Sequence, residues 1–577
     1  MPIHNADIAK RFEEAADLLE IKGDNPFRIR AYRNAARVIE DLPHELAAMV
    51  EQEQPLSDLP GIGKDLAEKI QEIVTTGTAP ALDKLRSELP PHITDLLNIP
   101  GLGPKRVRTL YKDLAVVDLD SLKQAAEEGK IRDLPGLGKK TEQHILDAVR
   151  AQADTSRRFL RAAVVPYVES LAAYLKQAPA LKTLTIAGSY RRGRETIGDL
   201  DLLVVADDAE AIMQHFVAYD EVANVLAHGQ TKSSIVLQSG IQVDLRVVPA
   251  TSYGAALHYF TGSKAHNITM RKLAQQRNWK LNEYGLLDGE TPVAAASEQD
   301  VYRALDLPFI PPELRENRGE VEAAREGRLP DLITAGDLRG NLHTHSRWSD
   351  GRNTIAEMAD AAVAAGHAYL AITDHSKRLT VANGLDEDRL IEQIEEIDAL
   401  NEARNDVTIL KGIEVDILED GTLDLPDAVL KLLDLVIVSV HSKFNLSSEQ
   451  QTTRIQRAMD NPWTTLVAHP TGRLLLSRPP YAVDVARLIA HARQRGCFLE
   501  LNANPQRLDL NDTYCQLARQ EGVKLALNTD AHNTRDLVAH VDAGIAQARR
   551  GWLEAGDVIN TRELPDLLAL LKQPRQA

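Results

Sequence analysis

AGSYRRGRETIGDLDLLVV, from Ala187 to Val205, is the stretch that decides the central part of this fold. A glycine-rich turn with two adjacent arginines leads into an apolar run that carries Asp199 and Asp201. Because residues i and i+2 of a strand point to the same face, both carboxylates are expected on one surface of a sheet. Paired oxygen ligands suit Mg²⁺, which is commonly held by one or two carboxylates together with substrate phosphates. The stretch therefore indicates phosphoryl or nucleotidyl transfer.

A third carboxylate is needed if two metal ions are to act together, and Asp244 is the candidate. It lies in the alternating run 241–248, which predicts a neighbouring strand. Gly188 lets the backbone approach a phosphate closely, and Arg192 can pair with that phosphate as a fixed fork. An Asp-x-Asp pattern alone is more often a turn or a solvated strand end. With the turn, the arginines and the second strand beside it, nucleotidyl transfer is favoured.

Two segments resemble family X DNA polymerases, the group that contains DNA polymerase beta. Residues 188–193 with 198–201 match the palm signature of that family, and residues 259–263 with Asn267 and Arg271 match its nucleotide-binding segment. The resemblance implies a polymerase whose catalytic carboxylates, Asp199, Asp201 and Asp244, bind Mg²⁺ or Mn²⁺. It also implies a dNTP site, with the candidates Gly188, Ser189, Arg192, Gly198, Tyr259, Phe260, Gly262, Asn267 and Arg271.

By the same resemblance, Ser189 and Arg192 hold the triphosphate, while Tyr259, Phe260 and Asn267 line the sugar and the base. One alternative is a nucleotidyltransferase that copies no template. DNA-binding motifs elsewhere in the chain argue against it.

Length and composition limit the class of protein. A chain of 577 residues is too long for one core, and about 150 residues per domain suggests about four domains. Two cysteines, Cys497 and Cys515, cannot form a disulfide framework or a thiolate zinc site, which indicates a reducing compartment. The sequence has no run of 18 apolar residues and no signal-like start. We expect a soluble, cytoplasmic monomer with no membrane partner.

The net charge of −17 argues against nucleic-acid binding through a generally basic surface. Contacts with phosphates must therefore be local. Backbone amides, helix N-termini and a few placed cations can supply them.

The first 80 residues predict helices, because apolar residues recur at three- and four-residue spacing over 8–21, 27–41, 43–51 and 64–75. A repeated hexapeptide indicates a function for this helical region and the helices that follow it. The hexapeptide LPGIGK at 59–64 recurs as IPGLGP at 99–104 and LPGLGK at 134–139, each before a helix. Glycines before a helix allow a tight hairpin whose amides point at a phosphate.

These repeats resemble the helix-hairpin-helix motif of DNA-binding proteins that read no sequence. One copy alone is as often an ordinary turn, whereas three favour contacts with the DNA backbone. The DNA-binding candidates are Gly61, Gly63, Gly101, Gly103, Lys105, Gly136 and Gly138. The N-terminal domain also resembles that of lyase-competent polymerases, where a lysine at the position of Lys69 attacks an abasic sugar. Asp65 and Glu68 favour the protonated lysine, so a surface lysine is the alternative reading.

The last 240 or so residues alternate apolar strands with amphipathic helices, which predicts parallel βα units arranged as a barrel. The expected strands are 368–373, 408–413, 435–440, 465–468, 498–501 and 524–528. Metal-type residues stand at or after nearly every strand, which is where barrel enzymes place their active site. These residues are His343, His345, Asp350, His375, Glu414, His441, His469, Asp530 and His532.

Their spacing resembles the polymerase and histidinol phosphatase (PHP) domain. The motifs NLHTH at 341–345, TDHS at 373–376, GIE at 412–414 and NTDAH at 528–532 match it. All nine ligand positions are filled, which implies an active cluster of up to three ions. Mixed imidazole and carboxylate ligands suit Mn²⁺, Zn²⁺ or Fe²⁺ more than Mg²⁺ alone.

The sequence thus predicts a multidomain α+β and α/β protein. The expected parts are a lyase-like helical domain (1–80), a fingers-like domain with helix-hairpin-helix motifs (81–155), a palm (156–255), a thumb (256–318), a linker (319–334) and the PHP domain (335–577). The run 313–328 is charged and ends near Pro330, which predicts a linker or an exposed helix. We expect a DNA-repair polymerase that fills short gaps, as in base excision repair, using dNTPs on gapped or nicked DNA. The PHP domain is expected to trim 3′ ends, with abasic-site cleavage as a further activity. The alternative is a DNA end-binding scaffold with a structural PHP domain.

Overall fold

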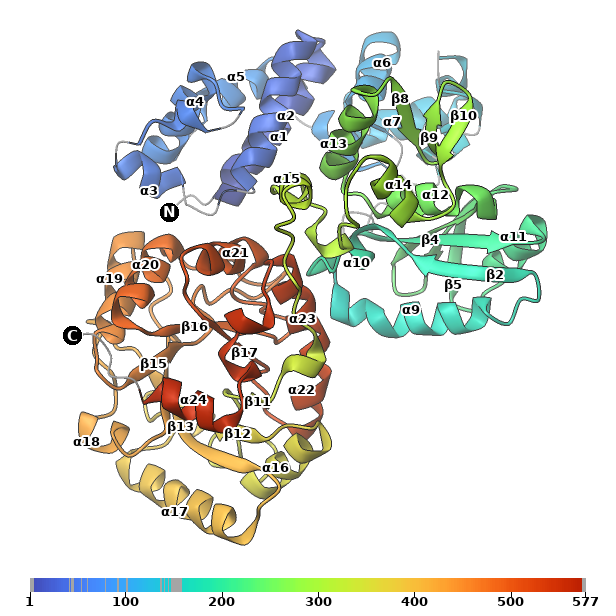
Figure 1. Cartoon of the computed structure of the whole chain (residues 1–577). Helices are drawn as coiled ribbons and strands as arrows, with labels where there is room; N and C mark the ends of the chain where they lie inside the picture. The colour runs from blue at the N-terminus through green and yellow to red at the C-terminus, as the bar shows by residue number, and fades with distance from the viewer. Residues whose placement is uncertain are drawn as a thin grey trace. The chain divides into compact units, whose positions relative to one another are not determined.

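The computed structural model describes residues 5–572, except 41, 43–45, 53, 60, 78, 91, 92, 100, 101, 135, 136, 140, 144 and 147–157. The chain divides into two units, and Figure 1 labels helices and strands of both. Unit 1 contains Met1–Arg158 and Met213–Asp244, and unit 2 contains Phe159–Ile212 and Leu245–Ala577. Among the described helices, none has both the length and the apolar character needed to cross a bilayer.

Unit 1 is built mainly from amphipathic helices around one apolar core. The predicted helical spacing is confirmed, with the start of the predicted helix 43–51 outside the described residues. Phe12 and Tyr32 are buried in the core, where their rings pack 5.4 Å apart. The helices are α1 (Asn5–Lys22), α2 (Pro26–Glu40), α3 (Leu46–Glu51), α4 (Lys64–Thr76), α5 (Pro80–Ser87), α6 (Pro104–Leu114) and α7 (Leu119–Glu127). Strands β5 (Val222–His228) and β6 (Lys232–Leu237) add an antiparallel hairpin, followed by β7 (Gln242–Val247), whose last residues belong to unit 2.

Unit 2 begins with a small α/β portion that carries the glycine-rich turn. Strand β2 (Leu181–Ile186) pairs antiparallel with β4 (Asp199–Ala206), and α10 (Gly188–Arg191) lies between them in sequence. Val248, after β7, donates its N–H to the carbonyl of Val204 at 2.9 Å. The same portion contains α9 (Arg161–Leu175) and the short antiparallel pair β1 (Phe159–Leu160) and β3 (Thr196–Ile197). Helix α11 (Ala209–Val217) follows β4.

A second apolar core forms the thumb-like portion, which packs around Tyr302 and Ile310. Its elements are α12 (Tyr253–Thr261), α13 (Lys264–Gln275), the antiparallel strands β8 (Trp279–Asn282), β9 (Gly285–Asp288) and β10 (Thr291–Ala294), and α14 (Glu298–Ala304). The next segment, with α15 (Glu320–Arg325), was expected from its charge to be a linker or an exposed helix. That expectation is wrong for Arg315 and Glu320, which are fully buried because each charge meets a partner from a distant part of the chain.

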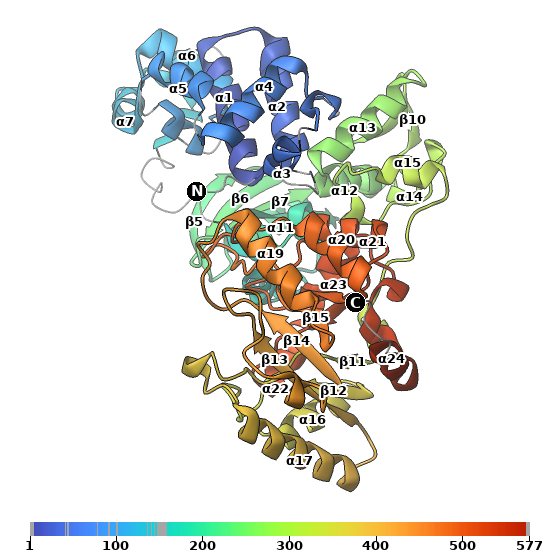
Figure 2. The same cartoon turned by 90° about the vertical axis from the view of Figure 1, so that its left-hand side faces the viewer.

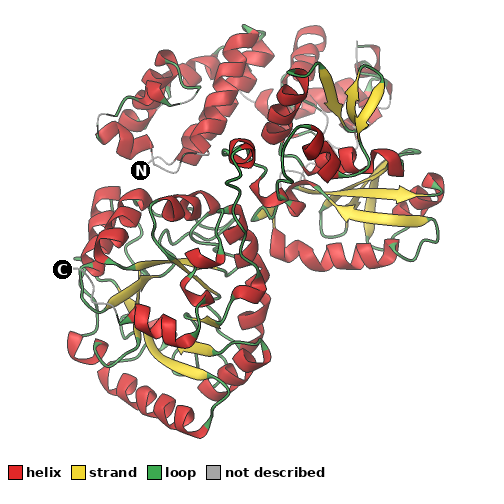
Figure 3. Ribbon diagram, viewed as in Figure 1, coloured by secondary structure: helices red, strands yellow, loops and turns green. Residues whose placement is uncertain are grey.

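The predicted barrel is confirmed as a parallel seven-stranded sheet that is nearly closed, with strand order β11 to β17. Figure 3 shows its strands in yellow inside a ring of red helices. A parallel bridge between Thr344 and Ala531 joins the loops after the first and last strands. The strands are β11 (Gly340–Asn341), β12 (Tyr369–Ile372), β13 (Thr408–Asp416), β14 (Leu435–Ser439), β15 (Thr464–Val467), β16 (Phe498–Asn502) and β17 (Leu525–Asn528). The two-residue strand β11 is too short to give a periodic signal in the sequence.

Helices cover the outside of the barrel, and in Figure 2 strands β11 to β15 lie side by side behind them. They are α16 (Ile355–Ala364), α17 (Glu387–Ala403), α18 (Asp427–Leu430), α19 (Ser448–Met459), α20 (Val485–Arg495), α21 (Asp512–Gln520), α22 (Thr534–Ala539) and α23 (Val541–Arg550). The last helix, α24 (Leu564–Leu571), packs Leu567 and Leu571 against Tyr369, Leu435 and Phe498, where strands begin. An apolar plug thus fills this end, and polar side chains are left to the ends where the strands finish.

Candidate active sites

The predicted metal ligands of the barrel all lie at or after the carboxyl ends of strands. Parallel strands finish at one edge, so residues far apart in the sequence meet there. Histidines 343 and 345 follow β11, His375 follows β12, and Glu414 lies on β13. The remaining ligands follow later strands in order: His441 after β14, His469 after β15, and Asp530 and His532 after β17.

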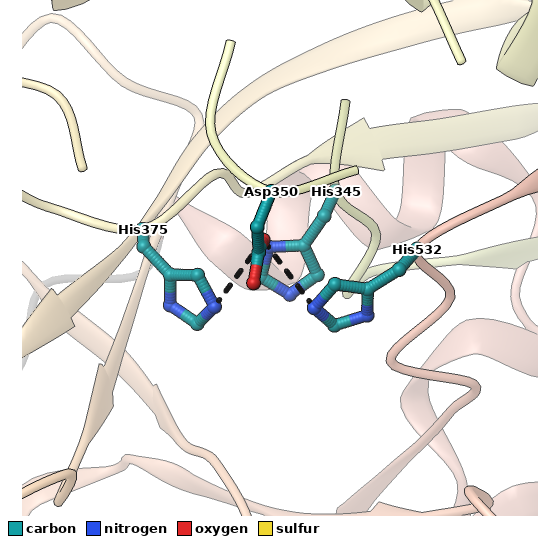
Figure 4. A group of neighbouring side chains, drawn as sticks. All are labelled: His345, Asp350, His375 and His532. Atoms are coloured by element: carbon teal, nitrogen blue, oxygen red, sulfur yellow. Dashed lines mark ion pairs between the residues drawn. The ribbon is translucent and has the colours of Figure 1, made fainter. Parts of the chain in front are cut away.

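Eight of the nine predicted ligands form three overlapping groups, in each of which the ligand atoms lie within 4.8 Å of one another. The first group, drawn in Figure 4, places Asp350 between two imidazoles, with its Oδ1 3.4 Å from His532 Nε2 and 3.7 Å from His375 Nε2. His345 completes it. The other groups are His343 with His345 and Asp530, and His375 with Glu414 and His441.

Glu414 is the carboxylate at which the groups meet. Its Oε2 lies 2.7 Å from His375 Nδ1 and 3.5 Å from His343 Nε2. Its Oε1 lies 3.0 Å from Nε2 of His469, the ninth ligand, and 3.4 Å from Nε2 of His441. A carboxylate with imidazoles at both oxygens can bridge neighbouring ions.

Buried atoms without hydrogen-bond partners test whether these residues fit metal ions. Among the described side chains, Nε2 of His343, Nδ1 of His345, Nδ1 of His375 and Oε2 of Glu414 are buried and have no partner in hydrogen-bond geometry, although His375 Nδ1 and Glu414 Oε2 approach to 2.7 Å. Such atoms cost about 1–3 kcal/mol each when left unsatisfied. They are imidazole nitrogens and a carboxylate oxygen, the donors that divalent transition metals take, so the residues fit a metal cluster.

The electrostatics of the cluster also favour cations. Burial opposes ionisation of Asp350, but the imidazoles of His532, His345 and His375 outweigh it and lower the pKa of the carboxyl to about 2. Burial likewise disfavours the charged form of Glu414, and the surrounding imidazoles hold its pKa well below the usual value. The site therefore keeps ionised carboxylates at neutral pH. It opens on the side of Asp350 and His532, whose side chains are 38% and 32% exposed.

The structure adds a carboxylate that the sequence interpretation missed. Glu500 on β16 accepts a hydrogen bond from His343 Nδ1 at 2.7 Å and another from the backbone N–H of His469 at 2.8 Å. A carboxylate on the far nitrogen fixes the tautomer and the orientation of a ligand imidazole. The signal was an acidic residue inside the apolar strand 498–502, the one strand to which no ligand had been assigned.

In the palm, the alternation predicted for Asp199 and Asp201 is confirmed on β4. Leu200 between them is fully buried, whereas Asp199 is exposed and Asp201 partly exposed. Gly188 has φ +60°, and a Cβ placed on it would lie 2.3 Å from Asp201 Oδ2. Only glycine therefore lets the turn lie over this carboxylate.

Asp244 lies on β7, as the alternating pattern predicted. Lys232 Nζ is 2.8 Å from its Oδ2, and the amide of Gln242 donates to its Oδ1 at 3.2 Å. Burial raises the pKa of this carboxyl, but its bonds to Lys232 and Ser234 outweigh burial and lower it. Asp244 is thus an ionised carboxylate near the end of unit 1.

The glycine-rich turn and the nucleotide-binding segment predicted from the sequence meet in unit 2. Arg192 Nη1 donates to the carbonyl of Thr261 at 2.5 Å, and a Cβ on Gly262 would lie 3.3 Å from the same nitrogen. Arg192 Nε also donates to Glu316 at 3.0 Å, a contact the sequence did not indicate. Ser189 lies on α10 between Gly188 and Arg191. Gly198, which precedes β4, is exposed.

The candidates for the sugar and base also lie together. Asn267 donates its side-chain amide to the carbonyl of Tyr259 at 2.7 Å, and Arg271 Nε donates to the carbonyl of Asn267 at 3.2 Å. Phe260 packs its ring 5.1 Å from that of Tyr259 and lies under the guanidinium of Arg246. Asn267 Oδ1 is buried without a hydrogen-bond partner within the described residues, so this acceptor is available to a ligand.

Two of the predicted hairpins can be followed in unit 1. Gly63 and Gly103 directly precede α4 and α6. Of the residues that the structure describes, none caps either helix with its side chain, and none lies within 4 Å of a Cβ added to these glycines. Within the part of the chain that the structure describes, the N–H groups of Lys64, Asp65 and Lys105 are therefore open to an anion, whereas Pro104 has no N–H to offer. Gly61 has φ +83°, and Gly138 is equally open, while Gly101 and Gly136 lie outside the described residues. Lys105 in the first turn of α6 is exposed.

The lyase candidate Lys69 lies on α4 and forms an ion pair with Asp65, one turn earlier. Its Nζ also donates to the Asp65 carbonyl at 3.2 Å. These contacts favour the protonated amine, as the sequence indicated, and its lyase role stays a prediction.

A palm with paired carboxylates, a nucleotide-binding thumb junction, DNA-binding hairpins and a barrel with a histidine and carboxylate cluster define a DNA polymerase joined to a metal-dependent phosphoesterase. Comparison with known families agrees. A helix-hairpin-helix domain matches residues 3–79, a SAM-like helix-hairpin-helix tandem 93–151, the DNA polymerase beta thumb 256–316, and the PHP domain 341–530.

Among characterised proteins, the chain is 41% identical over 575 residues to the DNA polymerase/3′-5′ exonuclease PolX of Bacillus subtilis (strain 168), covering 99% of this chain and all of that protein. It is 25% identical over 347 residues to rat DNA polymerase lambda, covering 54% of this chain and 56% of that protein. A probable phosphatase of Thermoanaerobacter sp. (strain X514) is 31% identical over 232 residues, which cover 38% of this chain and 89% of the phosphatase. The chain belongs to the PolX family, the family X DNA polymerases that carry a PHP domain.

Proposed function

We propose that this chain fills short gaps in DNA at the palm and trims 3′ ends at the PHP cluster. Membership of the PolX family makes it a DNA polymerase with a 3′–5′ exonuclease that depends on divalent metal ions and acts on DNA and nucleotides. The proposal for the PHP cluster rests on one observation: His343, His345, His375 and Glu414 each have a buried nitrogen or oxygen atom that could bind a metal ion and that lacks a hydrogen-bond partner among the described residues. A barrel with a purely structural role has no use for them.

At the palm, Asp199, Asp201 and Asp244 would hold Mg²⁺ or Mn²⁺. When bound, these ions supply Lewis acidity toward the primer 3′-hydroxyl and the triphosphate. The residues of the chain position the reactants. Arg192, with Ser189 and the amides of the turn, would bind the triphosphate, and the Tyr259 and Asn267 pair would line the sugar and the base. The bond from Arg192 to the Thr261 carbonyl supports this arrangement, since it ties the phosphate-binding turn to the sugar-binding segment.

At the barrel, the nine predicted ligands would hold up to three ions of Mn²⁺, Zn²⁺ or Fe²⁺. When bound, such ions polarise a phosphodiester and lower the pKa of water. Glu414 would bridge, and Glu500 would keep Nε2 of His343 directed at the metal by accepting the proton on Nδ1. The exposed side at Asp350 and His532 would admit the 3′ end of a strand.

The hairpins would hold the gapped DNA through its backbone. The uncapped helix starts after Gly63 and Gly103 and the exposed Lys105 are local contacts of the kind that a chain of net charge −17 requires.

One experiment tests both activities in the same preparation. Purified protein is given a duplex with a one-nucleotide gap and Mn²⁺, first with dNTPs and then without them. Extension by one nucleotide followed by shortening of the primer is the expected result. Extension without shortening would reduce the barrel to the structural role of the scaffold alternative. Addition that ignores the template base would point to the non-templated nucleotidyltransferase.

A further inference from the structure

The turn that carries Arg192 is bonded directly to the PHP barrel through Arg550. This arginine ends α23 and is 2% exposed. Its Nη1 donates to the backbone carbonyl of Arg192 at 2.9 Å and to Glu316 Oε1 at 2.8 Å. Its Nη2 donates to Asp512 Oδ2 at 2.6 Å. One buried side chain of the barrel thus touches both the turn and the end of the thumb.

Arg192 is clamped through the same carboxylate. Its Nε donates to Glu316 Oε1 at 3.0 Å, and its Nη1 donates to the Thr261 carbonyl. Neither bond uses Nη2. The guanidinium is therefore fixed in direction, while within the described residues Nη2 is left for a further acceptor, and Glu316 also accepts a hydrogen bond from Arg550.

The turn and the barrel are also in close van der Waals contact. Gly193 has φ +68°, and a Cβ on it would lie 3.3 Å from the Cβ of Ala546 on α23. Two residues further on, Glu195 forms an ion pair with Arg473 of the barrel, with oxygen to nitrogen distances of 3.2 and 2.7 Å. The barrel thus contacts the C-terminal side of the turn at three positions between Arg192 and Glu195.

The charges of this contact balance inside the protein. Burial opposes ionisation of Glu316, but Arg550, Arg192 and Arg194 outweigh it and lower the pKa of the carboxyl to about 2. Arg318 adds a contact of 3.1 Å to Asp512. Fixed, paired charges of this kind preorganise a site, because their cost is met in folding and not when the ligand binds.

We propose that Arg550 is a positioning residue for nucleotide addition: it fixes Glu316 and the backbone of Arg192, and so holds the Arg192 guanidinium ready for the triphosphate. The inference rests on the proposed function in that it takes Arg192 as a triphosphate ligand. Arg550 itself touches no substrate. The PHP domain therefore contributes to dNTP binding in the palm, in addition to its own trimming reaction.

Loss of Arg550 should weaken nucleotide binding more than it slows chemistry. We expect Arg550→Ala to raise the KM for the dNTP about tenfold in filling of a one-nucleotide gap, with kcat changed by less than about threefold, since Arg550 supports binding of the triphosphate through Arg192 and touches no reacting atom. Arg550→Lys keeps the charge but not the forked geometry, so its KM should lie between those of the wild type and Arg550→Ala. Arg493→Ala, on the exposed face of α20, is the matched control and should change neither constant.

A second set of variants keeps the test decisive if Arg550→Ala fails to fold. Glu316→Gln removes the charge that clamps Arg192 and keeps the shape, so it should also raise the KM. Trimming by the same preparations reports whether the barrel is intact. An unchanged KM in Arg550→Lys and Glu316→Gln, or a lower KM in Glu316→Gln, would overturn the inference, the latter because Glu316 would then compete with the triphosphate.

Arg192→Ala separates failure of this inference from failure of the proposed function. If Arg550 acts through Arg192, the double variant Arg192→Ala/Arg550→Ala should have the same KM as Arg192→Ala alone. Independent effects would multiply, and this would show that Arg550 does not act through Arg192. If Arg192→Ala leaves the KM unchanged, the assignment of Arg192 as a triphosphate ligand fails. If it raises the KM while Arg550→Ala does not, only the positioning role fails.

Discussion

In the barrel the predicted metal ligands lie inside the protein, whereas in the palm the leading carboxylate lies at the surface. The side chains of His343, His345 and Glu414 have no exposed area. Asp199 is exposed, and Asp201 is partly exposed beneath Gly188. The barrel ligands contact one another and residues such as Glu500, while Asp199 and Asp201 come from a single strand beneath a single turn.

This difference shows how each site obtains its order. The barrel cluster is assembled by folding, because its ligands come from six strand ends that only the closed sheet brings together. The palm carboxylates are two residues apart, and the geometry of one strand is enough to pair them. A change of a metal ligand at one site should therefore abolish the activity of that site, gap filling or trimming, and leave the other activity intact.

The largest effect is expected at the palm. Asp201→Ala, and likewise Asp199→Ala, should lower gap filling by roughly a thousandfold or more, because loss of a metal ligand removes several kcal/mol of transition-state stabilisation. Trimming should stay within about twofold, since its ligands belong to the barrel. Primer extension and primer shortening by one preparation give both numbers. Asp207→Ala, whose side chain is 68% exposed beyond the same strand, is the control. Loss of both activities in a folded Asp201→Ala protein would contradict the assignment of gap filling and trimming to two separate sites.

The reverse separation is expected from the barrel. His343→Ala or His345→Ala should reduce trimming by about a hundredfold and remove most of the bound transition metal, because a cluster held by shared ligands loses a donor. Nucleotide addition should be spared, and the fold should survive because both histidines follow β11 on a loop. Metal analysis beside a primer-degradation assay checks this, with His491→Ala on α20 as the control. Unchanged degradation would place trimming elsewhere, and loss of gap filling alone would favour the scaffold alternative.

A smaller effect is expected at Glu500, which acts on the cluster through His343. Glu500→Gln keeps the shape of the side chain but removes the charge that stabilises the proton on His343 Nδ1. We expect trimming and metal affinity to fall about 10- to 100-fold, the usual consequence of losing a carboxylate behind a ligand histidine. Gap filling should not change. Glu521→Gln, at the exposed end of α21, controls for loss of a negative charge. Full trimming in Glu500→Gln would show that the ligand needs no such support.

The ease with which each site is predicted follows from the same difference. The palm carboxylates and the barrel ligands can be found from sequence, because strand alternation and the ends of parallel strands are local patterns. Glu500 could not be assigned, since an acidic residue within an apolar strand gives no partner by itself. Arg315, Glu316 and Glu320 were expected in a linker or an exposed helix because their run is charged. Their partners, which include Glu298, Arg550 and His266, become visible only when the chain is folded.

The remaining effect concerns stability and not activity, and it arises at the buried Glu320, which lies between the thumb and the barrel in sequence. Burial raises the pKa of this carboxyl to about 7, although the backbone N–H groups of Asn317 and Arg318 donate to it and lower it. His266, 2.7 Å away, has its pKa lowered by burial to about 3 and stays neutral. The folded protein therefore keeps a proton on Glu320 between the ordinary pKa of 4.5 and about 7, where the unfolded chain has lost it.

Because the pKa of Glu320 is raised in the folded state, this carboxyl stabilises the folded protein fully below pH 4.5, and this stabilisation is lost as the pH rises through 7. Glu320→Gln cannot ionise, so the wild type should gain about 3 kcal/mol relative to this variant between pH 8 and pH 4.5. Because both proteins keep His266, its opposite contribution cancels in the difference. Thermal unfolding of the full chain at several pH values measures it, with the exposed Glu322→Gln on the same helix as the control. A difference that does not change with pH would mean that Glu320 is ionised in the folded protein, and the buried charges around it would then have to be assigned again.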